Sequence, residues 1–261
     1  MATIEDLKTW VLYRKHGREV YQHEKSIDDP SIPESIRALF TKDQKLEIGD
    51  VSHSVLRDEL LTYCKTFAPD FKIDEFNTVC IDQIIKWLRN DDPILKANKG
   101  ILLRGGVGSG KTTLFKALRE LINRIVFYDF SIPYEFREYS STLPKRFNIT
   151  TAAKISSDFA IDGFAILDNN ITGRKTYTTM DYVRGTLLID DFGSEQIPSH
   201  YGSVVNIIGE IITRRYEANA LTYLTSNLSI EEIKTVYGMR VYDRLREMVN
   251  DVLLLGESRR R

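Results

Sequence analysis

A glycine-rich segment gives the clearest chemical signal in the sequence. Residues 105–112 read Gly-Gly-Val-Gly-Ser-Gly-Lys-Thr, which fits the phosphate-binding pattern G-x-x-x-x-G-K-[ST]. The segment follows the apolar run 101–103 and precedes a helical pattern, which is the context that such a loop requires. Glycines let backbone N–H groups approach phosphate oxygens, and the following helix N-terminus favours negative charge. We therefore expect nucleotide binding by Gly105, Gly106, Val107, Gly108, Ser109, Gly110, Lys111, Thr112 and Thr113.

Two acidic residues end a second apolar run, Leu187-Leu188-Ile189-Asp190-Asp191. A buried strand that ends in carboxylates delivers them to the edge of a parallel sheet where a phosphate loop also lies. Lys111 is expected to hold the β- and γ-phosphates, while Thr112 and Asp190 bind Mg²⁺, Asp190 through water. Asp191 is expected to polarise the attacking water. Asp191 has a shorter side chain than Glu, which favours slow hydrolysis.

A third apolar run, residues 221–225, is followed by Ser226 and Asn227. Asn227 is expected to lie between the other two motifs and to position a water molecule near the γ-phosphate. Ser-Asn is also common in turns and helix caps, so the pattern taken alone is weak.

The elements around these motifs alternate between short apolar runs and helical stretches, which predicts a parallel sheet flanked by helices. We expect strands over 101–103, 147–150, 186–189, 221–225 and 252–255. We expect helices over 112–123, 151–163, 204–217, 230–237 and 241–250, with Thr151 as a cap. Apolar residues at three- and four-residue steps also predict helices over 51–64 and 76–88.

Composition narrows the class of protein. The 261 residues carry 36 basic and 37 acidic side chains, a net charge of −1, which argues against a polybasic nucleic-acid coat or an acidic disordered tail. Residues 1–98 hold 14 basic and 18 acidic residues, and residues 99–261 hold 22 and 19. Neither a signal peptide nor a membrane-spanning run is expected. The two cysteines, Cys64 and Cys80, are expected to pack as small apolar groups. This use of cysteine predicts a protein of the reducing cytoplasm.

The order of phosphate loop, acidic strand, polar strand end and late arginines resembles an AAA+ ATPase of the bacterial replicative helicase loader type (DnaC/DnaI-like). Transposase helper ATPases of the IstB type are related to these loaders. The resemblance begins near Gly100 and covers about three-fifths of the chain. It is carried by residues 105–112, 187–193 (LLIDDFG), 211–216 (IITRRY), 224–228 (LTSNL), 237–248 (YGMRVYDRLREM) and 256–260 (GESRR).

This resemblance implies a fold and a division of the chain. The fold is α/β: a three-layer P-loop AAA+ ATPase with a parallel sheet and a shortened C-terminal lid, preceded by a small helical N-terminal module. Only 34 residues follow Asn227, which is too few for the larger lid of many AAA+ proteins. We expect the module to span residues 1–95 and the ATPase domain to span residues 96–261.

The resemblance also implies roles for several arginines. Arg244 aligns with the arginine finger that reaches the γ-phosphate bound to a neighbouring subunit, and Arg240, one turn earlier, is an alternative. Arg260 aligns with the sensor-2 arginine. Because Arg259 and Arg261 flank it, either could take this role if the alignment shifts by one residue. The helix near the subunit boundary contains Arg214 and Arg215.

The expected function is to help load a hexameric replicative helicase onto single-stranded DNA under control of ATP and Mg²⁺. The N-terminal module is expected to bind the helicase, and Arg244 implies self-association. The main alternative is a transposition helper ATPase acting on double-stranded DNA with a transposase; a P-loop kinase and a nucleotide-bound scaffold without turnover are others. The predicted insertion, residues 126–144, mixes aromatic and basic residues that either stack single-stranded DNA bases or pack on the core.

Overall fold

The computed structural model describes residues 52–125, 147–167, 180–195, 199–200, 203–256 and 258. The predictions for residues 1–51, for the insertion at 126–144 and for Arg259, Arg260 and Arg261 lie outside these ranges.

A five-stranded sheet forms the centre of the molecule, with its strands in the order β2-β3-β6-β1-β7. Every neighbouring pair in this sheet is parallel. The strands are β1 (Gly100–Gly105), β2 (Asn148–Thr151), β3 (Leu187–Asp190), β6 (Thr222–Ser226) and β7 (Val249–Leu254). The strand that precedes the phosphate loop and the strand that ends in acidic residues are therefore separated by β6 alone.

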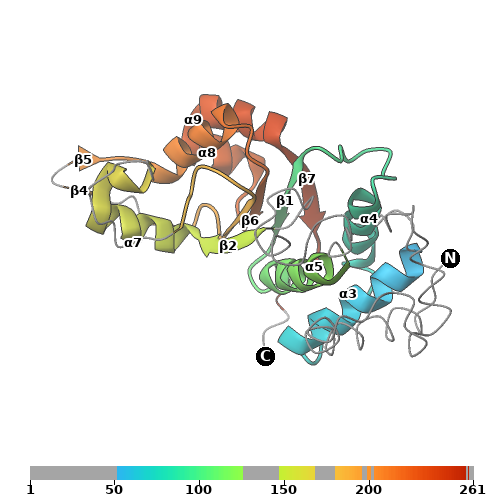
Figure 1. Cartoon of the computed structure of the whole chain (residues 1–261). Coiled ribbons are helices and arrows are strands. Elements are labelled where there is room, and N and C mark those ends of the chain that lie inside the picture. The colour runs from blue at the N-terminus through green and yellow to red at the C-terminus, as the bar shows by residue number, and fades with distance from the viewer. Residues whose placement is uncertain are drawn as a thin grey trace, which may run out of the picture.

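Alternate side chains of each strand face opposite sides of this sheet, and each side is covered by apolar residues. On β1, Ile101 and Leu103 join one hydrophobic cluster and Leu102 joins the other. Figure 1 shows helices α3, α4 and α5 on one side of the sheet and α7, α8 and α9 on the other. Because both faces of a parallel sheet are covered in this way, its strands read as continuous apolar runs. The predicted three-layer α/β fold is confirmed.

Most helices begin at a residue whose side chain caps them. Ser52 caps α3 (His53–Phe67), Thr151 caps α7 (Ala152–Asp162) as predicted, and Asn206 caps α8 (Ile207–Glu217). Ser229 and Glu232 form a capping box at the start of α9 (Ile230–Met248). The remaining elements are α4 (Thr78–Arg89), α5 (Lys111–Ile125), the 3-10 helix η2 (Gly163–Leu167) and the short strands β4 (Ser199–His200) and β5 (Ser203–Val204).

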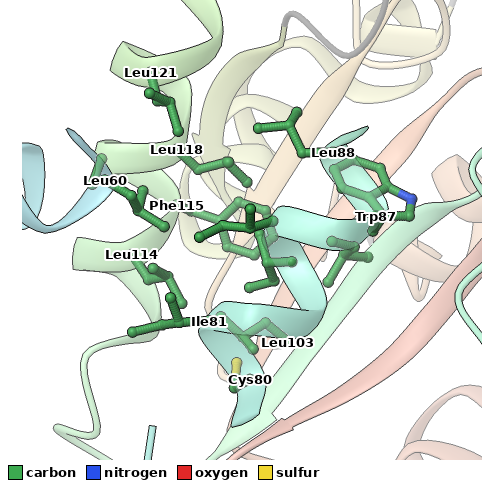
Figure 2. Packing of buried hydrophobic residues seen from close by; sticks show 14 of the residues in the cluster. Leu60, Cys80, Ile81, Trp87, Leu88, Leu103, Leu114, Phe115, Leu118 and Leu121 are labelled. Carbon is green, nitrogen blue, oxygen red and sulfur yellow. The ribbon is translucent and has the colours of Figure 1, made fainter. Parts of the chain in front are cut away.

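Helices α3 and α4 share one hydrophobic core with the sheet. Their buried residues belong to the same cluster as α5 and β1, and the close-up in Figure 2 includes Leu60, Ile81, Leu103 and Phe115. The indole N–H of Trp87 on α4 also donates a hydrogen bond to the carbonyl of Lys99, next to β1, at 3.1 Å. The described part of the predicted N-terminal module, residues 52–95, therefore packs directly against α5 and the sheet. None of the helices in the described ranges is long and apolar enough to cross a membrane.

Candidate nucleotide-binding site

Three parallel strands bring the predicted site residues to one edge of the sheet. The phosphate loop follows β1, Asp190 is the last residue of β3, and Asn227 directly follows β6. The carboxyl ends of parallel strands lie at the same edge, where ligands bind in open α/β sheets. The fold thus gathers at this edge motifs that are far apart in the sequence.

Lys111 lies at the centre of this edge. Its ammonium group donates hydrogen bonds to the carbonyl oxygens of Gly105 and Gly106, each at 2.9 Å, and to Oδ1 of Asn227 at 2.6 Å. The side chain is buried, and all three acceptors are uncharged. Phosphate oxygens of a nucleotide at the loop could take the place of these three neutral acceptors. The structure therefore brings together the two residues predicted to act on phosphate, Lys111 and Asn227.

Thr112 and Asp190 are also in contact. The Thr112 hydroxyl donates to Oδ1 of Asp190 at 3.0 Å, and Asp190 is almost fully buried. A hydroxyl beside a carboxylate is a donor set that Mg²⁺ accepts, because this hard cation prefers oxygen ligands and keeps several waters. The buried Ser109 hydroxyl in the same loop has no hydrogen-bond partner among the described residues, so the loop retains an unused polar atom. These residues fit a Mg²⁺-bound nucleotide.

Asp191 occupies an unusual backbone conformation directly after β3. Its φ is 55°, in the left-handed region, which few residues other than glycine adopt but which aspartate and asparagine tolerate better than most. Its N–H donates to the Thr225 hydroxyl at 2.9 Å, and the Phe192 N–H donates to the Thr225 carbonyl at 2.8 Å. These bonds hold the turn at the end of the acidic strand, and the Asp191 residue is exposed there.

Two further residues that sequence reasoning missed line the phosphate loop. A Cβ at Gly108, where φ is 78°, would lie only 2.3 Å from Oγ of Ser258, and a Cβ at Gly110 would lie 3.6 Å from the ring of Phe71. The C-terminal segment and the loop between α3 and α4 therefore both reach the site. Ser258 is two residues before Arg260, the predicted sensor-2 arginine, which lies outside the described residues.

The predicted finger Arg244 lies far from this edge. Its guanidinium donates to Oγ1 of Thr213 at 2.6 Å, pairs with Glu217 at 3.5 Å and lies over the ring of Tyr216. These partners belong to the last turns of α8, just before β6 begins at the amino edge of the sheet. The five residues of β6 span roughly 16 Å. Arg244 therefore does not reach the phosphate loop of its own subunit.

The other arginines in the neighbouring segments differ in exposure. Arg240 is exposed and makes no hydrogen bond or ion pair with any residue in the described ranges. It follows Gly238, where α9 kinks with φ of 80°. Arg214 is partly exposed and pairs with Glu210, whereas Arg215 is fully buried. Of the two arginines in the IITRRY segment, only Arg214 is available at the surface.

Comparison with known proteins gives one related sequence and several structural neighbours. No family model matches the chain. A stretch of 79 residues is 37% identical to the replicative helicase loader DnaC of Buchnera aphidicola subsp. Baizongia pistaciae (strain Bp). The chain resembles a DnaC-type helicase loader. This match covers 30% of the chain and 30% of that relative's length.

The structural neighbours of this chain are more distant in sequence. A crystal structure of the DnaC helicase loader is 20% identical, with a TM-score of 0.47, covering 72% of this chain and 94% of that one. A crystal structure of DnaI is 17% identical, with a TM-score of 0.40, covering 84% of this chain and 95% of that one.

Proposed function

We propose that this protein binds ATP with Mg²⁺ and hydrolyses it slowly. The observation that carries this proposal is the hydrogen-bonded cluster at the carboxyl edge of the sheet, in which Lys111 contacts Asn227 and Thr112 contacts Asp190. Lys111 exchanges its present acceptors for β- and γ-phosphate oxygens, and Thr112 and Asp190 hold Mg²⁺. Asp191 polarises the attacking water, and Asn227 orients it. The loop from Gly105 to Thr113 supplies the backbone cradle.

A second subunit completes the proposed site. Arg244 is separated from its own phosphate loop by the length of β6, so a role in hydrolysis requires another copy of the chain. Arg244 would have to exchange its bonds to Thr213 and Glu217, whereas Arg240 is already exposed. We assign the finger role to Arg244 and a supporting role to Arg240. Arg260 is assigned to the nucleotide of its own subunit.

The proposed cellular role is that of a helicase loader in the cytoplasm. The 37% identical stretch is shared with a protein named as a replicative helicase loader, and this supports extending its role to the present chain. The partner is a hexameric replicative helicase, bound through residues 1–95, and the substrate is single-stranded DNA. ATP binding and hydrolysis control how tightly the protein binds the helicase and the single-stranded DNA.

The first test measures ATP binding and hydrolysis by the purified full chain, with and without single-stranded DNA. Lys111→Ala should abolish binding, whereas Lys116→Ala, which changes an exposed lysine on the same helix, should bind normally. Arg244→Ala should bind ATP and lose DNA-stimulated hydrolysis, while Arg246→Ala, an exposed arginine two residues away, should retain it. Normal hydrolysis by Arg244→Ala would show that the finger assignment is wrong.

The second test identifies the partner. The full chain, with a non-hydrolysable ATP analogue, is used to capture proteins from a lysate of its source cells. Recovery of a replicative helicase, lost when residues 1–51 are removed from a chain that still binds ATP, supports the loader role. Recovery of a transposase, together with filaments on double-stranded DNA, would keep the ATPase and assign it to transposition.

A further inference from the structure

Thr225 contacts both acidic residues at the end of β3. The backbone register between β3 and β6 ends at the pair Ile189 and Leu224. Beyond that pair Asp191 turns into the left-handed region, and its N–H donates to the side chain of Thr225 instead. Thr225 is fully buried, so water cannot take the place of the hydrogen bonds that its hydroxyl makes.

The Thr225 hydroxyl both donates and accepts a hydrogen bond. A hydroxyl has one proton to donate and two lone pairs to accept with. Thr225 donates its proton to Oδ1 of Asp190 at 2.5 Å and accepts the N–H of Asp191 at 2.9 Å. One hydroxyl thus fixes the carboxylate of Asp190 and the backbone of Asp191 relative to each other.

The two oxygens of Asp190 are consequently different. Oδ1 accepts from both Thr112 and Thr225, whereas Oδ2 hydrogen-bonds to no residue in the described part of the chain. If the Thr112 hydroxyl turns to a metal ion, Thr225 is the hydroxyl donor that remains on Oδ1. It keeps the carboxylate from rotating, while Oδ2 makes no hydrogen bond to any described residue.

We propose that Thr225 is a positioning residue for Mg²⁺, which acts by orienting the Asp190 carboxylate. This inference rests on the proposed function, because it assigns a further residue to the same nucleotide site. Partners that orient a metal-binding carboxylate typically change metal affinity by about 10- to 100-fold when they are removed. Thr225 itself does not touch the nucleotide in this arrangement, since its hydroxyl proton and acceptor capacity are directed at the two aspartates.

A structural role for Thr225 predicts a different result from a positioning role, and another threonine on the same strand separates them. Thr222 is equally buried, and its hydroxyl accepts from Nε of Arg215 and donates to the Ala220 carbonyl. It lies at the opposite end of β6, away from the phosphate loop. Thr222→Val therefore removes a buried hydroxyl from the same strand without touching the acidic residues.

The experiment titrates Mg²⁺ into the full chain with a fluorescent, non-hydrolysable ATP analogue, and records thermal unfolding of the same variants without nucleotide. Thr225→Val should raise the Mg²⁺ concentration for half-maximal binding by about 10-fold or more. Thr225→Ser, which keeps the hydroxyl, should lie within about 3-fold of the unmodified chain, well below that range. Thr222→Val should lower the unfolding temperature and leave the Mg²⁺ midpoint unchanged.

Two results would overturn the inference. One is a Mg²⁺ midpoint for Thr225→Val that equals that of Thr222→Val, because the hydroxyl would then serve stability alone. The other is a Thr225→Ser variant that behaves like Thr225→Val. An unmodified chain that binds no analogue at any Mg²⁺ concentration overturns the proposed function itself, and this inference with it.

Discussion

A variant in which the buried arginine of α8 is replaced should unfold at a lower denaturant concentration than the unmodified chain. Arg215 is fully buried, and its guanidinium donates five hydrogen bonds. Their acceptors are the Thr222 hydroxyl and the carbonyls of Tyr182, Arg184, Gly185 and Leu221. Burial lowers the pKa of Arg215 to about 10, which still leaves the side chain protonated at neutral pH. Arg215 therefore links residues 182–185, which precede β3, to α8.

The magnitude follows from the acceptors that would lose their partner. The Leu221 carbonyl also accepts the N–H of Leu187, so it keeps one bond in Arg215→Met. The Tyr182 carbonyl is the main loss, because a buried group left unpaired costs about 1–3 kcal/mol. Gly185 is exposed, so water can reach its carbonyl. Removing the desolvated charge offsets part of this cost. We expect a loss of about 2 kcal/mol in the free energy of unfolding, or roughly 4–8 °C in Tm for a protein of this size.

Urea unfolding followed by circular dichroism measures this loss directly. The matched control is Arg214→Met, since Arg214 is adjacent, partly exposed and paired only one turn away with Glu210. The control should lie within about 0.5 kcal/mol of the unmodified chain. Arg215→Lys should also be destabilised, because one ammonium group has three donors and cannot replace five. If Arg215→Met unfolds at the same urea concentration as Arg214→Met, the hydrogen-bond argument is wrong.

Four further results are expected. Burial raises the pKa of the Cys64 and Cys80 thiols to about 12, so neither should react with a thiol reagent at pH 8 in the native protein, and both should react in denaturant. Since the unfolded thiols ionise near pH 9.0, the same shift makes stability fall as the pH rises from about 9 towards 12. Gly108→Ala should weaken binding of the ATP analogue roughly 10-fold or more because of its positive φ, and adding Ser258→Gly should relieve only the clash and not restore binding. Asp191→Asn should keep Tm within about 2 °C, because asparagine tolerates the left-handed region, while hydrolysis falls about 100-fold and ATP binding persists.

The central strands could be predicted from the sequence because β1, β3 and β6, which are covered on both faces, each contain a short apolar run. The run at 221–225 and the observed strand Thr222–Ser226 differ by one residue. The last strand begins at Val249, three residues before the predicted start, because α9 passes into β7 without a loop. The two helices predicted over 230–237 and 241–250 are the two halves of α9, which the positive φ of Gly238 separates by a kink.

The core of the site could be predicted because strand ends and a local motif specify it. Lys111 and Thr112 belong to one motif, and Asp190 and Asn227 each terminate an apolar run, so their meeting follows from parallel strand order. Thr225 could not be assigned in the same way, because its role depends on where the ladder between β3 and β6 stops. The one available signal was its position two residues before Asn227.

The packing between distant elements was outside the reach of sequence patterns. Periodicity predicted that α3 and α4 have an apolar face, and it does not say what that face covers. In the structure it covers α5 and β1, and Phe71, between the two helices, reaches Gly110 in the phosphate loop. A pattern within one segment carries no information about such a contact, because the partner is about forty residues away.

The loop after the acidic strand also connects the nucleotide site to the helix that carries the predicted finger. The Glu195 carboxylate accepts hydrogen bonds from the Gly193 N–H and from the Tyr237 hydroxyl, and the Phe192 ring stacks on Tyr237 at 4.3 Å. Tyr237 directly precedes the kink at Gly238. These contacts join the turn after Asp191 to the kink at Gly238, two residues before Arg240. In the proposed function, the residues assigned to hydrolysis and an arginine assigned to a neighbouring subunit are therefore joined by side chains that touch.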